Sequence, residues 1–212
     1  QFNVPLDVSV CPNGNLYIAD AGNYFIRKID NLGIITTVVG DGTTGGGAYG
    51  DGGPAIAAKL YGPIGLCFDL LGNLYIVDQL DQRIRKVDTA GMISTVVGSG
   101  GTGTFFGDGG AATAAFLNYP TDAVFDAHGN MFIADTENDR IRKVDTSGII
   151  STVVGTGTAA FGGDGGPAIG AMLYRPWDVN FDSLGNMFIS DTYNSRIRKI
   201  NLSGTINTIA GT

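Results

Sequence analysis

The sequence has little from which to build a metal centre or a cysteine-based active site. Its 212 residues include one histidine and two cysteines, and only 16% of them are charged. A lone histidine cannot form a multi-histidine metal site, so we expect His128 to be an exposed turn residue. Cys11 and Cys67 lack the C-x-x-C spacing of a metal or redox motif, and we expect them to be small buried side chains rather than a disulfide.

Other absences narrow the function further. No stretch approaches the roughly 18 consecutive apolar residues that span a bilayer. The net charge of −7 disfavours nucleic acid as a partner, because that affinity depends on clustered cations. No segment shows helical periodicity over ten residues, and nothing indicates a cofactor. No signal peptide is evident and the chain opens with Gln1, so we expect a processed chain or an excised segment.

Glycine is the abundant residue, with 34 copies. A collagen-like chain would need glycine at every third position, which this sequence does not have. Glycine at this level otherwise indicates many tight turns, and many turns in a short chain predict many short strands.

A repeat of 56–58 residues runs through the whole chain. Similar segments occupy residues 14–30, 72–88, 129–145 and 185–201. Each segment carries an aspartate in the same place, and each follows a proline at constant distance. The aspartates are Asp20, Asp78, Asp135 and Asp191, and the prolines are Pro5, Pro63, Pro120 and Pro176. A Gly-Asp-Gly-Gly tetrad separates the copies at 50–53, 107–110 and 163–166.

One period predicts four short strands. In the last copy they are residues 176–182, 186–191, 196–200 and 205–210, separated by Gly, Asn, Asp and Ser turns. A single helical turn is expected near 54–59. Four antiparallel strands repeated radially make a propeller blade. We therefore predict an all-β array over residues 1–212, with blades at about 1–42, 59–100, 116–157 and 172–212. The four blades either close directly or form an arc of a larger propeller or assembly.

The repeat resembles the NHL family of propellers. The resemblance rests on Asn-x-Arg-Ile, present at residues 138–141 and 194–197, on the preceding Tyr/Phe-Ile-Ala-Asp strand, and on the Gly-Asp-Gly-Gly-Pro-Ala linkers of many bacterial members. Two copies depart from it, with Phe25 in place of the arginine and Asp81 in place of the asparagine. The resemblance implies a binding or scaffolding platform, since most members are six-bladed platforms and a minority are enzymes. An amidating lyase of this family uses histidine ligands that this chain lacks.

The repeated charged residues have a structural interpretation. Asp20, Asp78, Asp135 and Asp191 are expected to accept backbone N–H groups and to pair with the arginine a few residues later in each repeat, with Arg83, Arg140 and Arg196 as the motif arginines. The Arg-x-Arg-Lys strands hold eleven of the thirteen cations. We expect them to form salt-bridged blade surfaces; a polyanion-binding stripe is the alternative.

Two sets of aspartates are candidate ligand sites. Asp7, Asp122 and Asp178 recur in the first strand of a blade, which lines the channel of a propeller, and Gly65 interrupts the set. Together with Asn180 they predict an acidic channel mouth that binds a cation or a polar ligand. The alternative is that these aspartates only cap turns. Asp51, Asp108 and Asp164 of the linkers suggest calcium, but each loop offers one carboxylate where calcium takes six to eight oxygens. A glycine turn with positive φ is the simpler interpretation.

These features predict a non-enzymatic interaction or structural module, extracellular or on a cell surface and bacterial. The same residues recur on every blade, whereas an active site needs different groups at particular positions. The expected partner is a second copy, another extracellular protein or a glycan. The alternative is a metal-dependent propeller lyase or lactonase that uses Asp7, Asp122, Asp178 and Asn180. Asn201 begins the only Asn-x-Ser/Thr sequon and is a candidate glycosylation site.

The blade ends carry a further expectation. If the four blades form an open arc, the first and last blades each expose an apolar face, and repetition makes those faces complementary. A head-to-tail contact of that kind closes into a ring or propagates as a filament. The sequence thus predicts self-association through blade faces, with two chains giving an eight-bladed ring and many giving a fibre.

Overall fold

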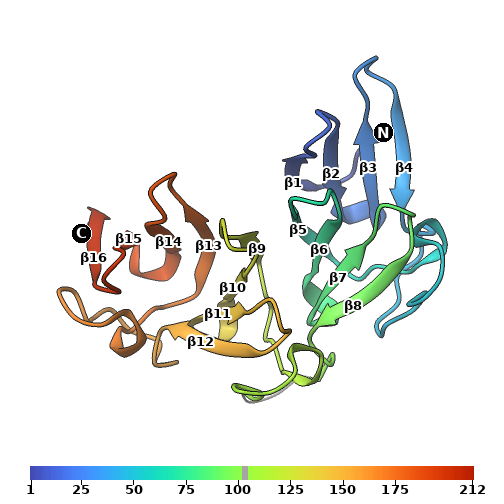
Figure 1. Ribbon diagram of the computed structural model, residues 1–212. Coiled ribbons are helices and arrows are strands. Elements are labelled where there is room, and N and C mark those ends of the chain that lie inside the picture. The colour runs from blue at the N-terminus through green and yellow to red at the C-terminus, as the bar shows by residue number, and fades with distance from the viewer. Residues whose placement is uncertain (102–104) are drawn as a thin grey trace. The chain divides into compact units, whose positions relative to one another are not determined.

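Four four-stranded antiparallel sheets make up the protein, seen in a computed structural model that describes residues 1–101 and 105–212 (Figure 1). Within each sheet the strands lie side by side in the order of the sequence. The chain divides into two compact units, Gln1–Thr102 and Gly103–Thr212, and each unit holds two blades. The predicted all-β fold of four-stranded propeller blades is confirmed.

The strand bounds repeat from blade to blade. The first blade has β1 (Pro5–Val10), β2 (Leu16–Asp20), β3 (Phe25–Ile29) and β4 (Ile35–Val39). The second has β5 (Pro63–Phe68), β6 (Leu74–Asp78), β7 (Arg83–Val87) and β8 (Ile93–Val97). The third has β9 (Asp122–Phe125), β10 (Met131–Asp135), β11 (Arg140–Val144) and β12 (Ile150–Val154). The fourth has β13 (Pro176–Phe181), β14 (Met187–Asp191), β15 (Arg196–Ile200) and β16 (Ile206–Gly211).

Helical structure in the described residues is confined to single 3₁₀ turns. One joins the second and third strands of each blade: η1 (Ala21–Asn23), η3 (Gln79–Asp81), η5 (Thr136–Asn138) and η7 (Thr192–Asn194). The others lie in the linkers: η2 (Ala55–Ala57), η4 (Ala112–Ala114) and η6 (Ala168–Gly170). The turn expected near residues 54–59 is η2. No helix among the described residues is long and apolar enough to cross a membrane.

Aspartates shape the hairpin between the first two strands of a blade. Asp69 follows β5, and its Oδ1 accepts the backbone N–H groups of Leu71 and Asn73 at 3.0 and 2.9 Å. Asn73 also donates its side-chain amide to Oδ2 at 2.7 Å. Side-chain oxygens that accept N–H groups two and four residues on hold the chain in a tight turn. The same pattern recurs at Asp126 and Asp182, which explains why these residues repeat.

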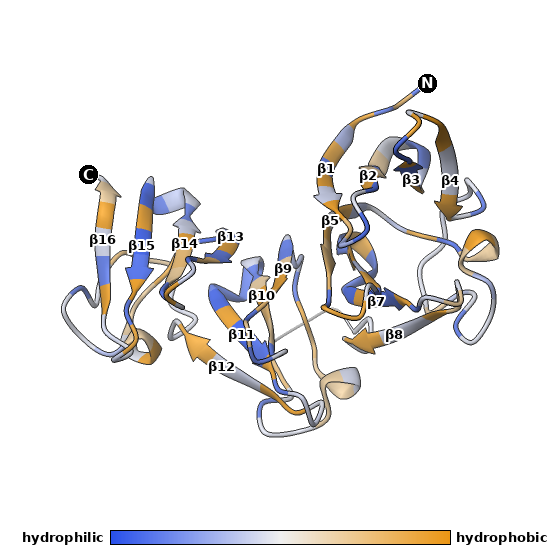
Figure 2. Cartoon of the chain, turned by 45° about the horizontal axis from the view of Figure 1, so that its top comes forward, coloured by the Kyte–Doolittle hydropathy of each residue, from blue (hydrophilic) through white to orange (hydrophobic). Residues whose placement is uncertain are grey.

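Each blade presents two apolar faces, which we name by their neighbours. The leading face carries the side chains of Leu66, Leu74, Ile76 and Ile93 in the second blade and packs on the linker that precedes it. The trailing face carries those of Ala19, Ile26 and Val39 in the first blade and packs on the linker that follows it. Alternate residues of a strand point to opposite faces, so one strand serves both. Figure 2 shows hydrophobic and hydrophilic residues within the same strand, for example in β15 and β16.

Both units build their core in the same way. In the first unit, the trailing face of the first blade and the leading face of the second enclose Ala55, Ala58 and Leu60 of the linker. In the second unit, the corresponding faces enclose Ala168, Ala171 and Leu173. An edge-to-face aromatic pair lies in each core, Tyr17 with Phe68 and Phe132 with Phe181, with ring centroids 4.9 and 4.8 Å apart. One blade-to-blade packing scheme is therefore repeated.

The glycines of the linker tetrad allow the chain to lie close to the next turn. Gly50 has φ of 89° and Gly52 has φ of 78°, which non-glycine residues rarely adopt. A Cβ atom on Gly50 would lie 2.8 Å from Cα of Ala58. The expected positive-φ glycine turn is confirmed, and it brings the aspartate between the two glycines to the edge of the following blade.

Candidate functional site

The aspartate that ends the second strand of each blade is buried in a cluster of hydrogen bonds. Asp135 has no exposed surface, and its carboxylate accepts the backbone N–H of Asn118 and the side-chain amide of Asn138, both at 2.8 Å. Burial raises the pKa of Asp135, and the hydrogen bonds from Asn138 and Asn118 oppose that rise. Asp191 repeats the arrangement with Tyr174 and Asn194. These aspartates fix the turn to the start of the blade.

The arginine that reaches these carboxylates is the second one of each Arg-Ile-Arg-Lys strand. Arg142 donates to Asp135 at 3.1 Å, and Arg198 donates to Asp191 at 3.0 Å. Arg85, Arg142 and Arg198 have no exposed surface. The expected salt bridges are present at these arginines, but the guanidinium groups are buried rather than exposed on the blade. They lie on the leading face, which the preceding linker covers, and burial requires them to be paired.

The second partner of each buried arginine is the linker aspartate. Arg142 donates to Asp108 at 2.8 Å, and Arg85 and Arg198 donate to Asp51 and Asp164 at 2.6 and 2.7 Å. The other carboxylate oxygen accepts a backbone N–H of the fourth strand, as Asp108 does from Thr152 at 3.0 Å. Burial raises the pKa of Asp164, but bonds from Thr208 and Arg198 outweigh it and hold the pKa below its usual value. The oxygens that suggested calcium are engaged in these bonds.

The second blade shows what the Asn-to-Asp departure does. Asp81 replaces the asparagine that donates to the buried aspartate in the other blades, and it pairs with Arg83 at 2.7 Å. Asp78 therefore lacks that amide donor, and its distance to Arg85 is 3.9 Å. Burial, followed by the nearby charge of Asp81, raises the pKa of Asp78 to about 7, although the Tyr61 N–H and the arginines oppose the rise.

In the second and third blades, the first arginine of the third strand binds the backbone where the fourth strand ends. Arg140 donates to the carbonyl oxygens of Asn138 and Thr156 at 2.8 and 2.7 Å, and its guanidinium lies 3.9 Å from the ring centre of Phe105. Arg196 stacks similarly on Phe161 at 3.7 Å. Arg83 donates to the carbonyl of Ser99 at 2.6 Å. These motif arginines hold the exit of the fourth strand.

The inner-strand aspartates connect neighbouring blades within a unit. Oδ2 of Asp7 on β1 accepts the backbone N–H of Leu66 on β5 at 2.7 Å, and Oδ1 accepts the N–H of Val8 at 2.7 Å. Oδ2 of Asp122 on β9 accepts the N–H of Val179 on β13 at 3.1 Å. In both units the aspartate of one blade thus bonds the backbone of the next, and capping of this kind needs no bound ligand.

One pair of carboxyl groups meets within the second unit. The carboxyl groups of Asp122 and Asp178 are neighbours. Burial first, and then the neighbouring Asp178, raise the pKa of Asp122 well above its usual range. Asp178 is exposed and Asp122 is half-buried. This pair is the part of the predicted channel mouth that the structure brings together.

The other predicted site residues lie apart from that pair. The side chain of Asn180 accepts the N–H of the adjacent Phe181 at 2.9 Å, so it is turned toward its own strand. Asp7 belongs to the first unit. Among residues 1–101 and 105–212, no group of three or more His, Cys, Asp or Glu side chains is placed to hold a metal ion. Asn201 is exposed, and its Oδ1 accepts the N–H groups of Ser203 and Thr205 at 3.0 Å.

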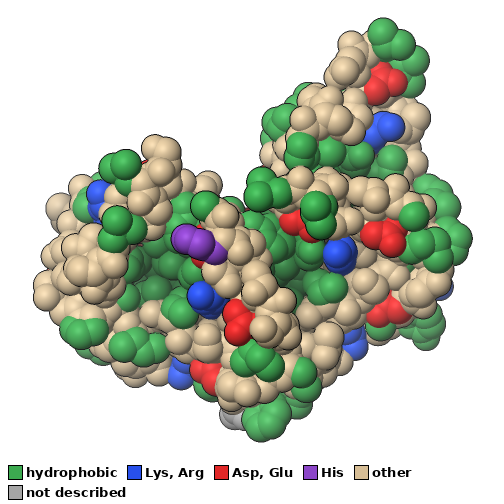
Figure 3. Space-filling model, viewed as in Figure 1, with side chains coloured by type: hydrophobic (Ala, Val, Ile, Leu, Met, Phe, Trp, Pro, Cys, Tyr) green, Lys and Arg blue, Asp and Glu red, His purple; other side chains and the backbone are tan. Residues whose placement is uncertain are grey.

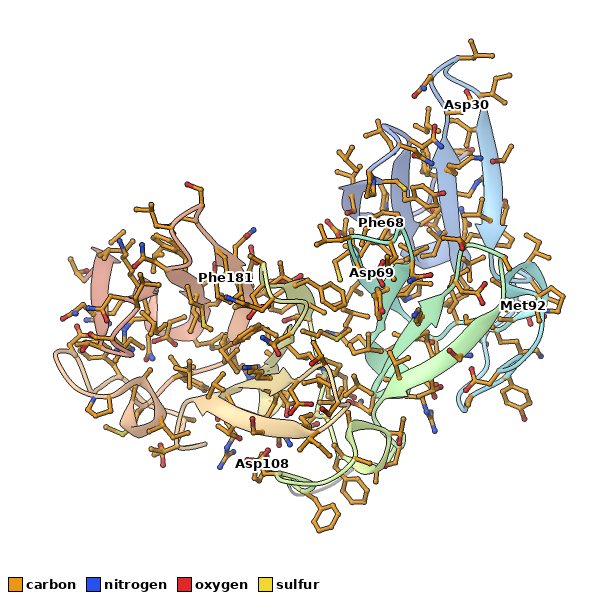
Figure 4. All side chains as sticks on the ribbon, viewed as in Figure 1. Asp30, Phe68, Asp69, Met92, Asp108 and Phe181 are labelled. Carbon is orange, nitrogen blue, oxygen red and sulfur yellow. The ribbon has the colours of Figure 1, made fainter. Side chains whose placement is uncertain are left out.

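The rare side chains have ordinary surroundings. His128 is exposed in its turn, as expected, 3.8 Å from Asp126 (purple in Figure 3). Cys11 and Cys67 are buried and not disulfide-bonded, which confirms the expectation of small buried side chains. Cys11 lines a cavity of about 370 Å³ between the first two blades, beside Tyr17 and Phe68. Figure 4 labels Phe68 and Asp69 at the end of β5.

The pairing of linker and arginine was missed at the level of sequence, although a signal for it exists. Each linker aspartate precedes its arginine by 34 residues in all three copies, for example Asp108 and Arg142 (Asp108 is labelled in Figure 4). A constant separation between two repeated, oppositely charged residues predicts a contact.

The four-stranded antiparallel sheets define a segment of a β-propeller. The teneurin NHL domain profile matches residues 43–105 and 102–162, and the NHL repeat profile matches residues 2–29. The chain belongs to the NHL-repeat β-propeller family.

Individual relatives are much longer than this chain. The protein SUPPRESSOR OF QUENCHING 1, chloroplastic, from Arabidopsis thaliana is 30% identical over 215 residues, which cover 95% of this chain and 20% of the plant protein. Teneurin-1 from Gallus gallus is 29% identical over 230 residues, which cover 98% of this chain and 8% of the teneurin. The chain thus spans a fifth or less of the length of these two relatives.

Solved structures share the fold at low sequence identity. A selenomethionine-substituted virginiamycin B lyase from Staphylococcus aureus superposes with a TM-score of 0.60 at 16% identity, covering 97% of this chain and 55% of the lyase. Identity at this level supports the fold and not the activity.

Proposed function

We propose that this chain is a non-enzymatic interaction and structural module that acts outside the cell or at its surface. Its binding surfaces are the leading face of the first blade and the trailing face of the fourth. The partner is a further blade of the same type, supplied by a second copy or by another blade-bearing protein. What carries the proposal is the exposure of apolar side chains on these faces, whose counterparts in the other blades are buried.

The first blade gives the sharpest contrast. Val8 is 58% exposed, whereas Leu66 at the same position of the second blade is 6% exposed. Leu16 and Ile35 are 37% and 43% exposed, whereas their counterparts are at 3% and 1%. An apolar face of this kind on a folded protein is typical of an interaction surface. At the other end, Ile197 and Ala210 line a depression of about 270 Å³ on the fourth blade.

The packing already present within each unit supports the choice of partner. A trailing face packs against a leading face in both units, with the same positions in contact. The exposed leading face of the first blade and the exposed trailing face of the fourth are of opposite kinds. A contact between them is heterologous and therefore leads to a ring or a filament.

A charge on the leading face tests the proposal. Val8→Asp should reduce self-association measured by sedimentation velocity, because the carboxylate would be buried without a partner. Leu70→Asp is the matched control, since Leu70 is 88% exposed in a turn. Equal association of both variants and the unmodified chain would contradict a role for this face.

The second candidate is ligand binding at the inner-strand carboxylates, with a lyase or lactonase reaction as its enzymatic form. The contact between Asp122 and Asp178 is the observation that favours it. It requires Asn180, in the same unit, to leave its backbone partner and join that pair around a cation. A divalent ion that is retained on purification and lost on chelation would favour this candidate, whereas indifference to chelators would oppose it. A glycan is the other proposed ligand, and the exposed Asn201 is the proposed glycosylation site.

A further inference from the structure

The leading face of the first blade has vacant positions for one particular kind of peptide. We propose that this face binds a Gly-Asp-Gly-Gly-x-Ala segment, the linker of a further NHL-type blade. The inference rests on the proposed function, because it names the first segment of that partner to engage the face. The second, third and fourth blades each hold an occupied copy of the same site.

Each occupied copy holds the linker with the same backbone bonds. In the second blade, the N–H of Gly52 donates to the carbonyl of Ile93 at 2.8 Å, and the N–H of Ile93 donates to the carbonyl of Gly53 at 3.0 Å. The N–H of Ala55 donates to the carbonyl of Gly91 at 2.8 Å. The third and fourth blades repeat this set with Ile150 and Ile206. The linker therefore adds to the outer strand as a short extra strand.

The charged part of the contact is also constant. The linker aspartate accepts from the buried arginine through one oxygen and from a backbone N–H of the fourth strand through the other. In the second blade these are Arg85 at 2.6 Å and Thr95 at 2.9 Å. A charge-assisted bond between partly buried groups is strong and directional, so the aspartate fixes the register of the linker.

The first blade has the same groups with nothing seated on them. Arg27 corresponds to Arg85, and in the described part of the chain its side chain makes no hydrogen bond or ion pair. The buried Nε atoms of Arg27, Arg85 and Arg198 all lack a partner, so the difference lies at the terminal guanidinium nitrogens, which donate to the linker aspartate in the occupied blades. Thr37 and Ile35 correspond to Thr95 and Ile93, and no linker lies on them within residues 1–101. A depression of about 140 Å³ lies beside these groups, lined by Gln1, Phe2, Arg27 and Ile35.

The chemistry of the vacancy selects its occupant. An unpaired guanidinium beside an unpaired strand edge favours a carboxylate carried on an extended backbone. The glycines are needed because the occupied linkers adopt positive φ on both sides of the aspartate, at 89° and 78° around Asp51. A small residue is needed at the last position because Ala55 is 1% exposed in the core.

The test adds a synthetic peptide with the sequence of residues 48–58 to the isotope-labelled full chain and follows backbone amide signals. We expect saturable shifts at Ile35 and Thr37, with Ile93 and Thr95 unchanged because their site is occupied. The same peptide with Asp→Asn should bind at least about tenfold more weakly, since one charge-assisted bond is lost. Arg27→Gln in the protein should have a similar effect.

Two results would overturn the inference: absence of shifts at Ile35 and Thr37, or equal binding of the aspartate and asparagine peptides. The peptide variant leaves the protein untouched, so the test does not depend on the folding of Arg27→Gln. Failure here is distinguishable from failure of the proposed function. If the chain is monomeric but binds the peptide, the linker site stands and the proposed self-association fails. If the chain associates but does not bind the peptide, self-association stands and the linker site fails.

Discussion

Arg142 and Asp108 lie 34 residues apart and form an ion pair of 2.8 Å that ties a linker to the blade following it. The guanidinium has no exposed surface and also binds Asp135, so one arginine joins the linker, the second strand and the third strand. The same three-way contact occurs at Arg198, and the second blade has a looser form of it at Arg85. The packing of the second and third strands thus depends on a linker that is 34 residues away in the sequence.

Asp108→Ala should destabilise the second unit. It leaves a buried guanidinium with one carboxylate fewer and frees the N–H of Thr152, and we expect a loss of about 2 to 4 kcal/mol in the free energy of unfolding. Chemical denaturation followed by circular dichroism measures it. Glu137→Gln removes the exposed pair with Arg175 and serves as the control, with an expected change of below about 1 kcal/mol. Equal losses in both variants would contradict a special role for the linker aspartate.

The second blade should lose stability as the pH rises. The pKa of Asp78 is raised to about 7 in the folded state, so its favourable contribution is complete below the unfolded value near 4 and is lost as the pH approaches 7. Asp78→Asn should remove this loss, which amounts to at most about 1.4 kcal/mol per pH unit. Denaturation at several pH values between 4 and 8 measures the slope.

Asp69→Asn in the same blade is the control, because the pKa of Asp69 is shifted in the opposite direction to that of Asp78. Burial raises the pKa of Asp69, but bonds from Asn73 and Tyr75 outweigh it and lower the pKa, so its contribution is lost only as the pH falls below about 4. This variant should leave the slope between pH 5 and 7 as it is. If Asp78→Asn also leaves that slope unchanged, the raised pKa of the buried Asp78 carboxyl group is wrong.

Replacing Asp178 by asparagine should change the pKa of its neighbour Asp122. Asp178→Asn replaces the neighbouring carboxyl with a group that can donate to Asp122 without competing for a proton, so the pKa of Asp122 should fall. Carboxyl carbon signals followed through a pH titration report it directly. Asn180→Asp is the control, because Asn180 is bonded to its own strand. An unchanged pKa at Asp122 in Asp178→Asn would mean that the neighbouring Asp178 does not raise it.

Alanine substitutions at Gly50 and Gly52 should lower the stability by different amounts, although both glycines have positive φ. Gly50→Ala places a Cβ atom 2.8 Å from Ala58 and also strains φ, whereas Gly52→Ala has nothing within 4 Å and pays only for φ. We expect a loss of about 1 kcal/mol for Gly52→Ala and a larger loss for Gly50→Ala. Thermal unfolding of the two variants side by side is sufficient. A smaller effect at Gly50 would contradict the close approach to Ala58.

Much of the fold is predictable because it repeats. Four copies of one pattern locate the strands and turns, and the 3₁₀ turn at Ala55–Ala57 follows from the sequence near Pro54. The burial of Arg85 is not predictable from its strand, since alternation along the strand does not say which face a linker will cover. The engagement of Asp7 and Asp122 with neighbouring backbones is hidden for the same reason, because both are contacts between blades.

The mass of the native particle, measured by light scattering over a range of concentrations, tests the central claim most directly. If the leading face of the first blade and the trailing face of the fourth are binding surfaces, the unmodified chain should form particles larger than its 22.0 kDa, as a ring of fixed mass or as filaments that grow with concentration. A compact monomer of 22.0 kDa at every concentration would contradict self-association through blade faces.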